Sequence, residues 1–503
     1  MTAVAGAADS APSTPRPERG DELELCVDSL AHGGEGVARL GEGGYVVFVA
    51  GAVPGDRVRA EVYKRKRSYA HARAVEILEP SPQRIEPLAD HPGVPWQVLP
   101  YEHQLAVKQE QVQDALRRIG GLDGFELEPI VPALEEWRYR NKLEYSFGNG
   151  ADGELQCGFH APAGWNRVIP LEDCLLASER GNQARRIALR WCREQGLRAW
   201  ERGVRDAGPG PGGEALLRNL VVREGRRTGR LQVRLVSTPG KLPDVAGLAK
   251  ALAAELNGEA PAAGGGQERS ATGLDRETPA AGLGGETLSG VLWTRSAALA
   301  ETTAGGETEL VWGEPELPER IGELDLRISP EAFLQTNTEM SDVLYGIAAD
   351  YAALEGWERV YDLYCGIGTI ALTLAPRAGE LWGIELVEQA VADAIAGARR
   401  NEIDRARFFA GDTRLALPEL VQRAGRPDVV VVDPPRAGLS AKVVRRIIEA
   451  GPRRIVYVSC NPTTLAPNAA QLEEAGWKLR RVRPVDMFPQ THHVETVSLL
   501  ERG

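Results

Sequence analysis

The sequence predicts a mixed α/β protein whose C-terminal part is a Rossmann-like, doubly wound domain. From residue 329 to residue 503, short segments rich in Val and Ile alternate with amphipathic segments. This alternation is typical of a parallel sheet that helices cover on both faces. Residues 21–80 contain about five strand-like segments separated by glycine-rich turns, which predicts a small β-barrel. Residues 81–328 mix both patterns, so we expect a central α+β domain there.

Composition excludes several classes of protein. The chain has 503 residues, of which 43% are hydrophobic and 26% charged, and it contains no apolar run of the roughly 18 to 20 residues that span a bilayer. Residues 1–20 lack the apolar core of a signal peptide, and we expect a disordered tail there. The six cysteines include no Cys-x-x-Cys pair, which argues against a disulfide scaffold or a zinc ribbon. We therefore expect a cytoplasmic protein.

Charge is distributed unevenly along the chain. The net charge of −12 disfavours nucleic acid as a partner of the whole surface, but residues 56–84 hold eight Lys and Arg against four Asp and Glu. Within this stretch a basic run lies beside Tyr69 and His71, and such a combination suits RNA backbone and stacking contacts. The run consists of Lys64, Arg65, Lys66 and Arg67. A solvated hairpin explains the same charges, so both interpretations stay open.

The middle of the chain contains three segments with a clear pattern. Apolar spacing predicts a helix over 105–119, and the run WRYRNKLEYSFG predicts a strand over 137–148. Residues 257–290 hold nine Gly and almost no large apolar side chain. Such a composition buries too little surface to offset its ordering entropy, so we expect a flexible insert without catalytic residues.

Strands and helices alternate in the C-terminal part. Apolar periodicity predicts a helix face formed by Val343, Leu344, Ile347, Ala348 and Tyr351. Strands are then expected at 359–365, 381–386, 406–411, 428–433 and 454–460, with helices between them and a pair of strands at the end.

Acidic residues lie at the ends of three consecutive predicted strands. Asp362 precedes the glycine loop CGIGT, Glu385 ends the next strand, and Asp412 follows the third. The loop resembles a dinucleotide fingerprint, which alone is a weak signal. Asp362 favours S-adenosylmethionine, because that cofactor carries a cationic amino group and a sulfonium but no phosphate. Glu385 can accept hydrogen bonds from ribose hydroxyls, and Asp412 can meet an adenine amine.

The last strands carry three more polar groups. Asp433-Pro-Pro-Arg436 follows the VVVV strand, a position where open sheets bind ligands, and similar turns occur in methyltransferases that act on exocyclic amines. Cys460 ends the next strand between Ser459 and Asn461, so its thiol is a candidate nucleophile, although a lone cysteine is more often structural. Glu495 precedes the final strand and is a candidate general base.

Together these motifs resemble the RNA 5-methyluridine (uracil-C5) methyltransferases, in the branch that begins with an OB-like TRAM barrel. The motifs are AHGGEGVARL, WRYRNKLEYSFG, Phe333-Leu-Gln335-Thr-Asn337, DLYCGIGT, GIEL, VVDPPRAGL, SCNPTTL and HHVETV. By this resemblance Cys460 is the nucleophile and Glu495 the base. The residues implied for S-adenosylmethionine are Gln335, Tyr364, Thr369, Glu385, Asp412 and Asp433. Those implied for RNA are Lys64, Arg65, Lys66, Arg67, Arg140, Asn141 and Lys142.

Chemistry is consistent with these roles. Carbon 5 of uracil becomes nucleophilic only after a thiolate adds to carbon 6, and a base must later remove the carbon 5 proton. One cysteine and one carboxylate suffice without a metal, and the base must leave the stack to be reached. His492 and His493 lack a third ligand at zinc spacing, so we expect no metal there.

The sequence departs from the resemblance at two places. Many relatives hold an iron–sulfur cluster with four cysteines, but here only Cys174 matches, so we expect no cluster. Pro467 and Asn468 stand where the family usually has Arg-Asp; the sequence leaves the effect on substrate binding open, and the nucleophile is retained.

Several functional readings remain at this stage. The resemblance implies a monomeric enzyme that methylates structured RNA, with 23S ribosomal RNA favoured by the TRAM barrel and transfer RNA as the alternative. A methyltransferase for an exocyclic amine would not need Cys460 or Glu495. A non-catalytic RNA-binding factor would carry a broken cofactor loop or lack the nucleophile.

Overall fold

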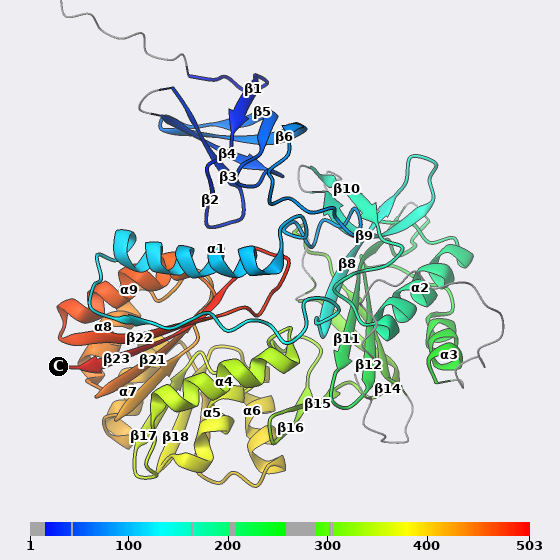
Figure 1. The fold of residues 1–503 in the computed structure, drawn as a ribbon. Coiled ribbons are helices and arrows are strands. Elements are labelled where there is room, and N and C mark those ends of the chain that lie inside the picture. The colour runs from blue at the N-terminus through cyan, green and yellow to red at the C-terminus, as the bar shows by residue number, and fades with distance from the viewer. Residues whose placement is uncertain are drawn as a thin grey trace, which may run out of the picture. The chain divides into compact units, whose positions relative to one another are not determined.

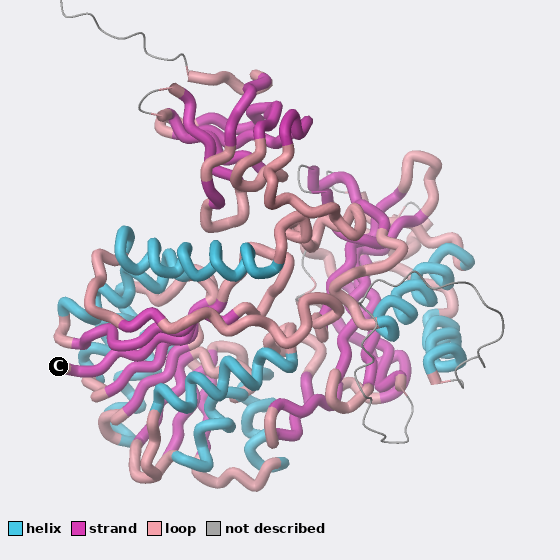
Figure 2. Tube along the Cα trace, viewed as in Figure 1, coloured by secondary structure: helices cyan, strands magenta, loops and turns pink. Residues whose placement is uncertain are grey.

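The computed structural model describes residues 16–41, 44–161, 164–201, 208–210, 212–257, 287–300, 303 and 305–503 (Figures 1 and 2). Most of the tail expected over 1–20 and of the insert expected over 257–290 lies outside these ranges. The described residues form two compact units, one within 1–88 and 95–107 and the other within 89–94 and 108–503. The domain limits 21–80, 81–328 and 329–503 stay predictions.

The first unit contains a sheet of six strands in the order β1-β5-β6-β4-β3-β2. The strands are β1 (Glu22–Cys26), β2 (Ser29–Leu30), β3 (Gly36–Leu40), β4 (Tyr45–Ala50), β5 (Arg57–Arg65) and β6 (Tyr69–Glu79). β1 also lies against β3, so the sheet curls into the predicted small barrel. Side chains alternate along β5, and Val58, Ala60 and Val62 are fully buried in the barrel core.

The segment at the start of the barrel forms two strands. The segment LELCVDSL becomes β1 and β2, because the backbone N–H groups of Val27 and Asp28 donate to Asp56 and Val37 instead of continuing one ladder. The barrel therefore has six strands where the sequence pattern suggested about five.

The helix expected over 105–119 begins earlier and changes its geometry at its end. α1 covers Tyr101–Asp114 and continues as a π-helical turn over Ala115–Ile119. In the second unit, Val112 and Leu116 on this helix are buried in the same core as Leu465 of a later helix. The part of α1 from Lys108 onward, with the π-helical turn, is thus part of the packing around the C-terminal sheet.

A seven-stranded sheet forms the middle of the chain, in the order β10-β9-β8-β11-β12-β13-β14. Its strands are β8 (Lys142–Asn149), β9 (Leu155–Ala161), β10 (Gly164–Pro170), β11 (Leu217–Gly225), β12 (Arg230–Ser237), β13 (Leu288–Arg295) and β14 (Glu307–Gly313). α2 (Glu179–Glu194) and α3 (Val245–Leu256) pack against one apolar face (Figure 1). A hairpin of β15 (Leu317–Ile321) and β16 (Leu324–Ile328) follows and contacts β11 and β12.

The strand predicted over 137–148 was wrong in its first part. Arg138 has a left-handed backbone with φ of 54°, and the N–H groups of Arg138 and Arg140 donate to the carbonyls of Leu175 and Leu176. These contacts draw residues 137–141 away from the sheet, so β8 begins only at Lys142. Asn141 stands at the point where the irregular segment enters the strand.

The C-terminal sheet has eight strands in the order β19-β18-β17-β20-β21-β23-β22-β7. Its strands are β17 (Arg359–Leu363), β18 (Glu380–Glu385), β19 (Ala406–Ala410), β20 (Val429–Val432), β21 (Arg454–Ser459), β22 (Trp477–Val485), β23 (Glu495–Arg502) and, from upstream, β7 (Glu126–Leu127). β17 to β21 run parallel, and β23 is antiparallel to both β21 and β22. The chain order reverses between β17 and β20, which is where such sheets bind ligands.

Helices cover both faces of this sheet, as the alternating pattern predicted (Figure 1). They are α4 (Thr338–Ala352), α5 (Thr369–Leu374), α6 (Glu388–Arg400), α7 (Thr413–Ala424), α8 (Ala441–Ala450) and α9 (Pro462–Glu474). α4, α5 and α6 share one core with Val429 and Val431, whereas α7, α8 and α9 share the other with Val430 and Val432. Within the described ranges, no helix combines the length and apolarity that crossing a membrane requires.

Candidate active site

A buried carboxylate lies at the point where the sheet order reverses. Asp362 in β17 has no exposed surface, and neither of its carboxylate oxygens has a hydrogen-bond partner of normal geometry. Burial raises the pKa of Asp362 well above its ordinary value, and the nearby charges of Asp433 and Glu385 raise it further. A buried acid without a partner is costly, so this position favours a cationic ligand group.

The conformation of the loop after β17 requires glycine at residue 368. Tyr364 is left-handed with φ of 67°, which ends the strand two residues earlier than the pattern suggested. Gly368 has φ of 80°, and a Cβ there would lie 2.9 Å from the Phe408 ring and 3.1 Å from the Ala394 Cβ. A Cβ on Gly366 would meet no atom within 4 Å, so the other side of the loop is open.

Glu385 is held firmly at the end of β18. Its Oε1 accepts from the backbone N–H groups of Leu386 at 2.7 Å and Val387 at 2.9 Å, and its Oε2 accepts from Gly366 at 3.1 Å. The carboxylate is therefore fixed against the glycine loop. Leu386 and Val387 are 69% and 56% exposed, which leaves two apolar side chains beside it.

Asp412, Tyr364 and Thr369 border the same loop. Asp412 is the N-cap of α7, and the hydrogen bond from the Arg414 side chain lowers its pKa to about 2. Tyr364 is half-buried, and burial followed by the charge of Asp412 raises its pKa. Thr369 begins α5, where its Oγ1 donates to the Tyr345 hydroxyl at 3.1 Å.

Asp433 and Gln335 form a hydrogen-bonded pair next to Asp362. Asp433 follows β20 directly, and burial raises its pKa to about 7 while the hydrogen bond from the Gln335 side chain lowers it. Gln335 is buried in the segment that precedes α4. Two acids, one of them poised near neutrality, thus face the ends of β17 and β20.

Cys460 and Glu495 lie at adjacent strand ends. β21 pairs with β23 so that Ser459 is opposite Thr496, which places the next residues, Cys460 and Glu495, across from each other. Burial and the charge of Glu495 raise the pKa of the Cys460 thiol to about 11, although the guanidinium of Arg436 opposes both. Burial and the charge of Asp433 raise the pKa of Glu495 well above its ordinary value.

The loop from Asp486 to Val494 that leads into Glu495 is anchored by distant residues. Lys108 Nζ lies 2.7 Å from Asp486 Oδ1 and also donates to the Phe488 carbonyl at 3.2 Å, and both side chains of this ion pair are fully buried. The Tyr139 hydroxyl donates to the Pro489 carbonyl at 3.0 Å, and Asn337 donates to that of Met487 at 3.0 Å.

Sequence reasoning missed these anchors. The one available signal was a lysine on the buried side of an amphipathic helix, where a charged residue needs a partner.

The adjacent histidines show no metal site. The rings of His492 and His493 are 4.1 Å apart, and burial followed by His492 lowers the pKa of His493 to about 2. Arg436 donates to His493 Nε2 at 3.4 Å. Among the described residues, no group of three or more His, Cys, Asp or Glu side chains is arranged to hold a metal ion.

The region of Cys174 does not fit an iron–sulfur cluster. The Cys174 Sγ lies 3.4 Å from His91 Nε2, and the Cys174 backbone N–H donates to Asn182 at 2.8 Å. Burial lowers the pKa of His91 to about 4, which makes it a neutral neighbour for the thiol. A thiol paired with one imidazole lacks the four ligands that a cluster requires.

The residues implied for RNA occur at two separate places. The basic run Lys64–Arg67 is exposed at the end of β5 and in the following turn, near the rings of Tyr63 and His71, which lie 6.0 Å apart. In the second unit, the Arg140 guanidinium lies 5.7 Å from the centre of the Phe488 ring.

The two neighbours of Arg140 are less accessible. Lys142 is partly buried and pairs with Glu144, and Asn141 is 5% exposed. Their role in RNA binding stays a prediction.

The doubly wound sheet, the glycine loop and the acids at its strand ends define an S-adenosylmethionine-dependent methyltransferase. Comparison with known proteins narrows the class. Residues 316–503 match the family model "tRNA (Uracil-5-)-methyltransferase", and residues 16–75 match the model for the TRAM domain.

Two relatives match over almost the whole chain. An RNA methyltransferase of Halalkalibacterium halodurans is 34% identical over 487 residues, covering 96% of this chain and 97% of the relative. One of Chlorobaculum tepidum is 34% identical over 509 residues, covering 97% and 98%. The chain therefore belongs to the RNA uracil-C5 methyltransferase family and begins with a TRAM domain.

A crystal structure supports the fold. The Pyrococcus abyssi tRNA (uracil-54, C5)-methyltransferase in complex with S-adenosyl-L-homocysteine matches with a TM-score of 0.69 and 24% identity. The match covers 95% of this chain and 100% of that chain. At this identity the likeness shows the shared fold.

Proposed function

We propose that the protein methylates carbon 5 of a uridine in structured RNA through a covalent adduct between Cys460 and uracil. The register of β21 and β23 carries the proposal, because it sets the thiol of Cys460 opposite the carboxyl of Glu495. This pair lies at the carboxyl edge of the sheet, where Asp433 couples electrostatically to both groups.

S-adenosylmethionine fits the residues at the reversal of the sheet. Asp362 and the open side of Gly366 offer a buried acid and close backbone approach for the cationic methionine end. Glu385, fixed by three backbone N–H groups, is suited to accept the ribose hydroxyls, and Asp412 to accept from the adenine amine. The full set that we propose is Gln335, Tyr364, Thr369, Glu385, Asp412 and Asp433.

When bound, S-adenosylmethionine supplies the methyl group. The thiolate of Cys460 forms a bond to carbon 6 of uracil, and the electron pair of the ring double bond passes to carbon 5 and its carbonyl. Carbon 5 would then form a bond to the methyl group that bound S-adenosylmethionine supplies, while the bond between that methyl group and the sulfonium breaks and S-adenosylhomocysteine is left. Glu495 accepts the proton from carbon 5, the double bond re-forms, and the bond between sulfur and carbon 6 breaks.

The resting thiol is protonated near pH 7, so a proton must leave Cys460 before the addition. Arg436 favours the thiolate electrostatically, whereas burial and Glu495 oppose it. We infer that the partly exposed thiol gives its proton to solvent water, and that the thiolate forms only when the uracil is in place. The target uridine must be unstacked to expose carbon 6 to the thiol.

RNA would contact the exposed basic run of the barrel and the surface around Arg140. Lys64, Arg65, Lys66 and Arg67 lie near aromatic rings that can stack on bases. Arg140 lies beside Phe488, close in the chain to Glu495, whereas Asn141 is 5% exposed and Lys142 is partly buried and paired with Glu144. A net charge of −12 over the whole chain is compatible with such local basic surfaces.

We propose 23S ribosomal RNA as the first candidate substrate, because the TRAM barrel suits a large structured RNA. Transfer RNA is the second candidate, and the name of the Pyrococcus abyssi enzyme favours it. Mapping 5-methyluridine in total RNA from a deletion strain and its parent would decide. Loss of one 5-methyluridine from 23S RNA supports the first candidate, and loss from transfer RNA supports the second. An unchanged pattern in both would contradict the proposed function.

A further inference from the structure

The four residues Gln335–Thr338 connect two parts of the proposed site. Gln335 donates from its side chain to Asp433. Asn337 donates to the carbonyl of Met487 at 3.0 Å, in the loop that leads to Glu495, and its Oδ1 caps α4 by accepting from Met340 at 3.2 Å. A small shift of this segment would therefore move groups beside the cofactor and beside the general base.

Asn141 holds this segment from the central sheet. Its backbone N–H donates to the Thr336 carbonyl at 2.9 Å. Its side-chain Nδ2 donates to the Gln335 carbonyl at 2.9 Å and to Thr338 Oγ1 at 2.8 Å, which uses both of its N–H bonds. Asn141 is also fixed from behind, because its carbonyl accepts from the backbone N–H of Glu224 at 2.7 Å.

A further layer of buried groups supports Thr338. Its Oγ1 donates to Glu319 Oε2 at 2.9 Å, and Glu319 is 2% exposed and accepts from the backbone N–H of Arg226 at 3.0 Å. Arg223 donates to the Ser329 carbonyl at 2.9 Å, in the chain that leads into Gln335–Thr338.

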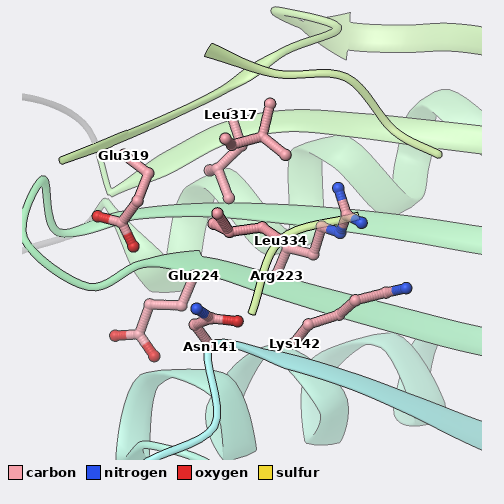
Figure 3. Close-up of a pocket in the computed structure, with 8 residues that line it drawn as sticks. Asn141, Lys142, Arg223, Glu224, Leu317, Glu319 and Leu334 are labelled. Atoms are coloured by element: carbon pink, nitrogen blue, oxygen red, sulfur yellow. The ribbon is translucent and has the colours of Figure 1, made fainter. Parts of the chain in front are cut away.

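Asn141, Arg223 and Glu319 line one small pocket with a cavity volume of about 10 Å³ (Figure 3). In Figure 3, Lys142 and Arg223 extend toward one side of the pocket, whereas Glu224 and Glu319 lie toward the other. The amide of Asn141 lies beside Glu224.

We propose that Asn141 is a positioning residue for methyl transfer, which fixes Gln335–Thr338 so that Gln335 reaches Asp433 and Asn337 reaches the loop before Glu495. This inference rests on the proposed function, because the position of Gln335–Thr338 matters for methyl transfer only if the protein is the proposed methyltransferase. Asn141 is buried with both amide N–H bonds used inside the chain, so it acts from behind the RNA-facing surface rather than by touching RNA. It also links the central sheet mechanically to the catalytic half.

The direct test is the affinity for S-adenosylmethionine, measured by calorimetry on the full chain, together with kcat and KM for methylation. Asn141→Ala leaves the Gln335 carbonyl and Thr338 without their donors. We expect Kd and KM for S-adenosylmethionine to rise by about ten- to a hundredfold, the scale of a misplaced site. The Kd for RNA should stay within about twofold, since no RNA contact is lost.

A matched control exists at the far end of β8, the strand that follows Asn141. Asn149 also bonds to backbone, accepting from the Ala199 N–H at 3.0 Å and donating to the Ala199 carbonyl at 3.2 Å, but it contacts no part of Gln335–Thr338. Asn149→Ala should lower thermal stability by a comparable amount and leave the Kd for S-adenosylmethionine unchanged. If Asn141 only stabilised the fold, Asn141→Ala and Asn149→Ala would both lower thermal stability, and both would leave the Kd for S-adenosylmethionine unchanged.

A second pair of variants keeps the test decisive if Asn141→Ala does not fold. Thr338→Val keeps the shape but removes the hydroxyl between Asn141 and Glu319, whereas Thr338→Ser keeps that hydroxyl. Thr338→Val should weaken S-adenosylmethionine binding, and Thr338→Ser should bind as the wild type does.

A pH profile adds an independent readout. Loss of the Gln335 contact should raise the pKa of Asp433, because that hydrogen bond favours the charged carboxylate. The acid limb of S-adenosylmethionine binding should therefore move to higher pH in Asn141→Ala and stay in place in Asn149→Ala.

Two results would overturn the inference. One is an Asn141→Ala variant that loses RNA affinity while its Kd for S-adenosylmethionine is unchanged, which would make Asn141 an RNA contact. The other is equal behaviour of Asn141→Ala and Asn149→Ala, or of Thr338→Val and Thr338→Ser. Because cofactor binding is measured without RNA, a wild type that binds S-adenosylmethionine but makes no 5-methyluridine would contradict the proposed function alone.

Discussion

The Cys460 thiol should be a slow nucleophile in the free enzyme. With a pKa of about 11, about two units above the 9.0 of an ordinary thiol, its thiolate population near pH 7.5 is roughly a hundredfold lower. A thiolate of higher pKa is intrinsically more reactive, by roughly tenfold for two units. Alkylation of Cys460 by iodoacetamide should therefore be about tenfold slower than that of free cysteine at the same pH.

The assay is peptide mass spectrometry after timed alkylation of the RNA-free protein between pH 7 and pH 10. Cys26 is exposed and provides an internal reference in the same sample. The Cys460 rate should rise about tenfold per pH unit across this range, because the thiolate fraction does so below its pKa. The slope is insensitive to steric access, which lowers all rates equally.

Replacing Arg436 should raise the pKa of the Cys460 thiol. Its guanidinium lowers the thiol pKa, so Arg436→Met should slow alkylation by a few-fold at every pH. Arg445→Met is the control, because Arg445 is exposed on α8 and pairs only weakly with Glu449. Two results would refute the conclusion that Cys460 is a buried thiol with a raised pKa. One is an alkylation rate of Cys460 that stops rising below about pH 9, and the other is a rate at pH 7.5 above that of free cysteine.

Three further predictions concern the base, the fold and the cysteine region. Glu495→Gln should accumulate a protein–RNA adduct that survives denaturation, because the carbon 5 proton has no acceptor; turnover at the wild-type rate would assign the base elsewhere. Lys108→Met should lower the free energy of unfolding by about 3 to 5 kcal/mol in denaturant titration, since it leaves the buried Asp486 charge unpaired. The double variant Lys108→Met with Asp486→Leu should recover most of that loss, and an additive loss would contradict the pairing. Protein purified without oxygen should contain no stoichiometric iron or sulfide; near-stoichiometric iron that is lost on Cys174→Ser would show a cluster.

The sequence predicted the arrangement of the C-terminal half because its signals are local. Buried parallel strands are rich in Val and Ile in the sequence, and an acidic residue directly after such a strand lies at the carboxyl edge of the sheet. Asp362, Glu385 and Asp433 could therefore be grouped before any coordinates. The approach of Cys460 to Glu495 depends on antiparallel pairing of β21 with β23, and it came from the family resemblance rather than from spacing.

Other features depend on contacts that spacing does not encode. Lys108 and Asp486 are 378 residues apart, and only the tertiary fold brings them together. The aromatic and basic alternation of WRYRN imitates a strand, yet the left-handed Arg138 diverts the chain. The sequence also grouped Asn141 with Arg140 and Lys142 as RNA-facing residues, because residue spacing does not show which side chain is buried.

The most direct measurement is the identification of the covalent link between enzyme and RNA. The enzyme would be incubated with S-adenosylmethionine and RNA that contains 5-fluorouridine, whose carbon 5 carries fluorine where a removable proton is needed, so the adduct has no route to eliminate. After nuclease and protease digestion, mass spectrometry should find a methylated 5-fluorouridine on the peptide that contains Cys460, and no adduct with Cys460→Ala. An adduct on a different residue, or formation of 5-methyluridine by Cys460→Ala at the wild-type rate, would contradict covalent catalysis by this thiol.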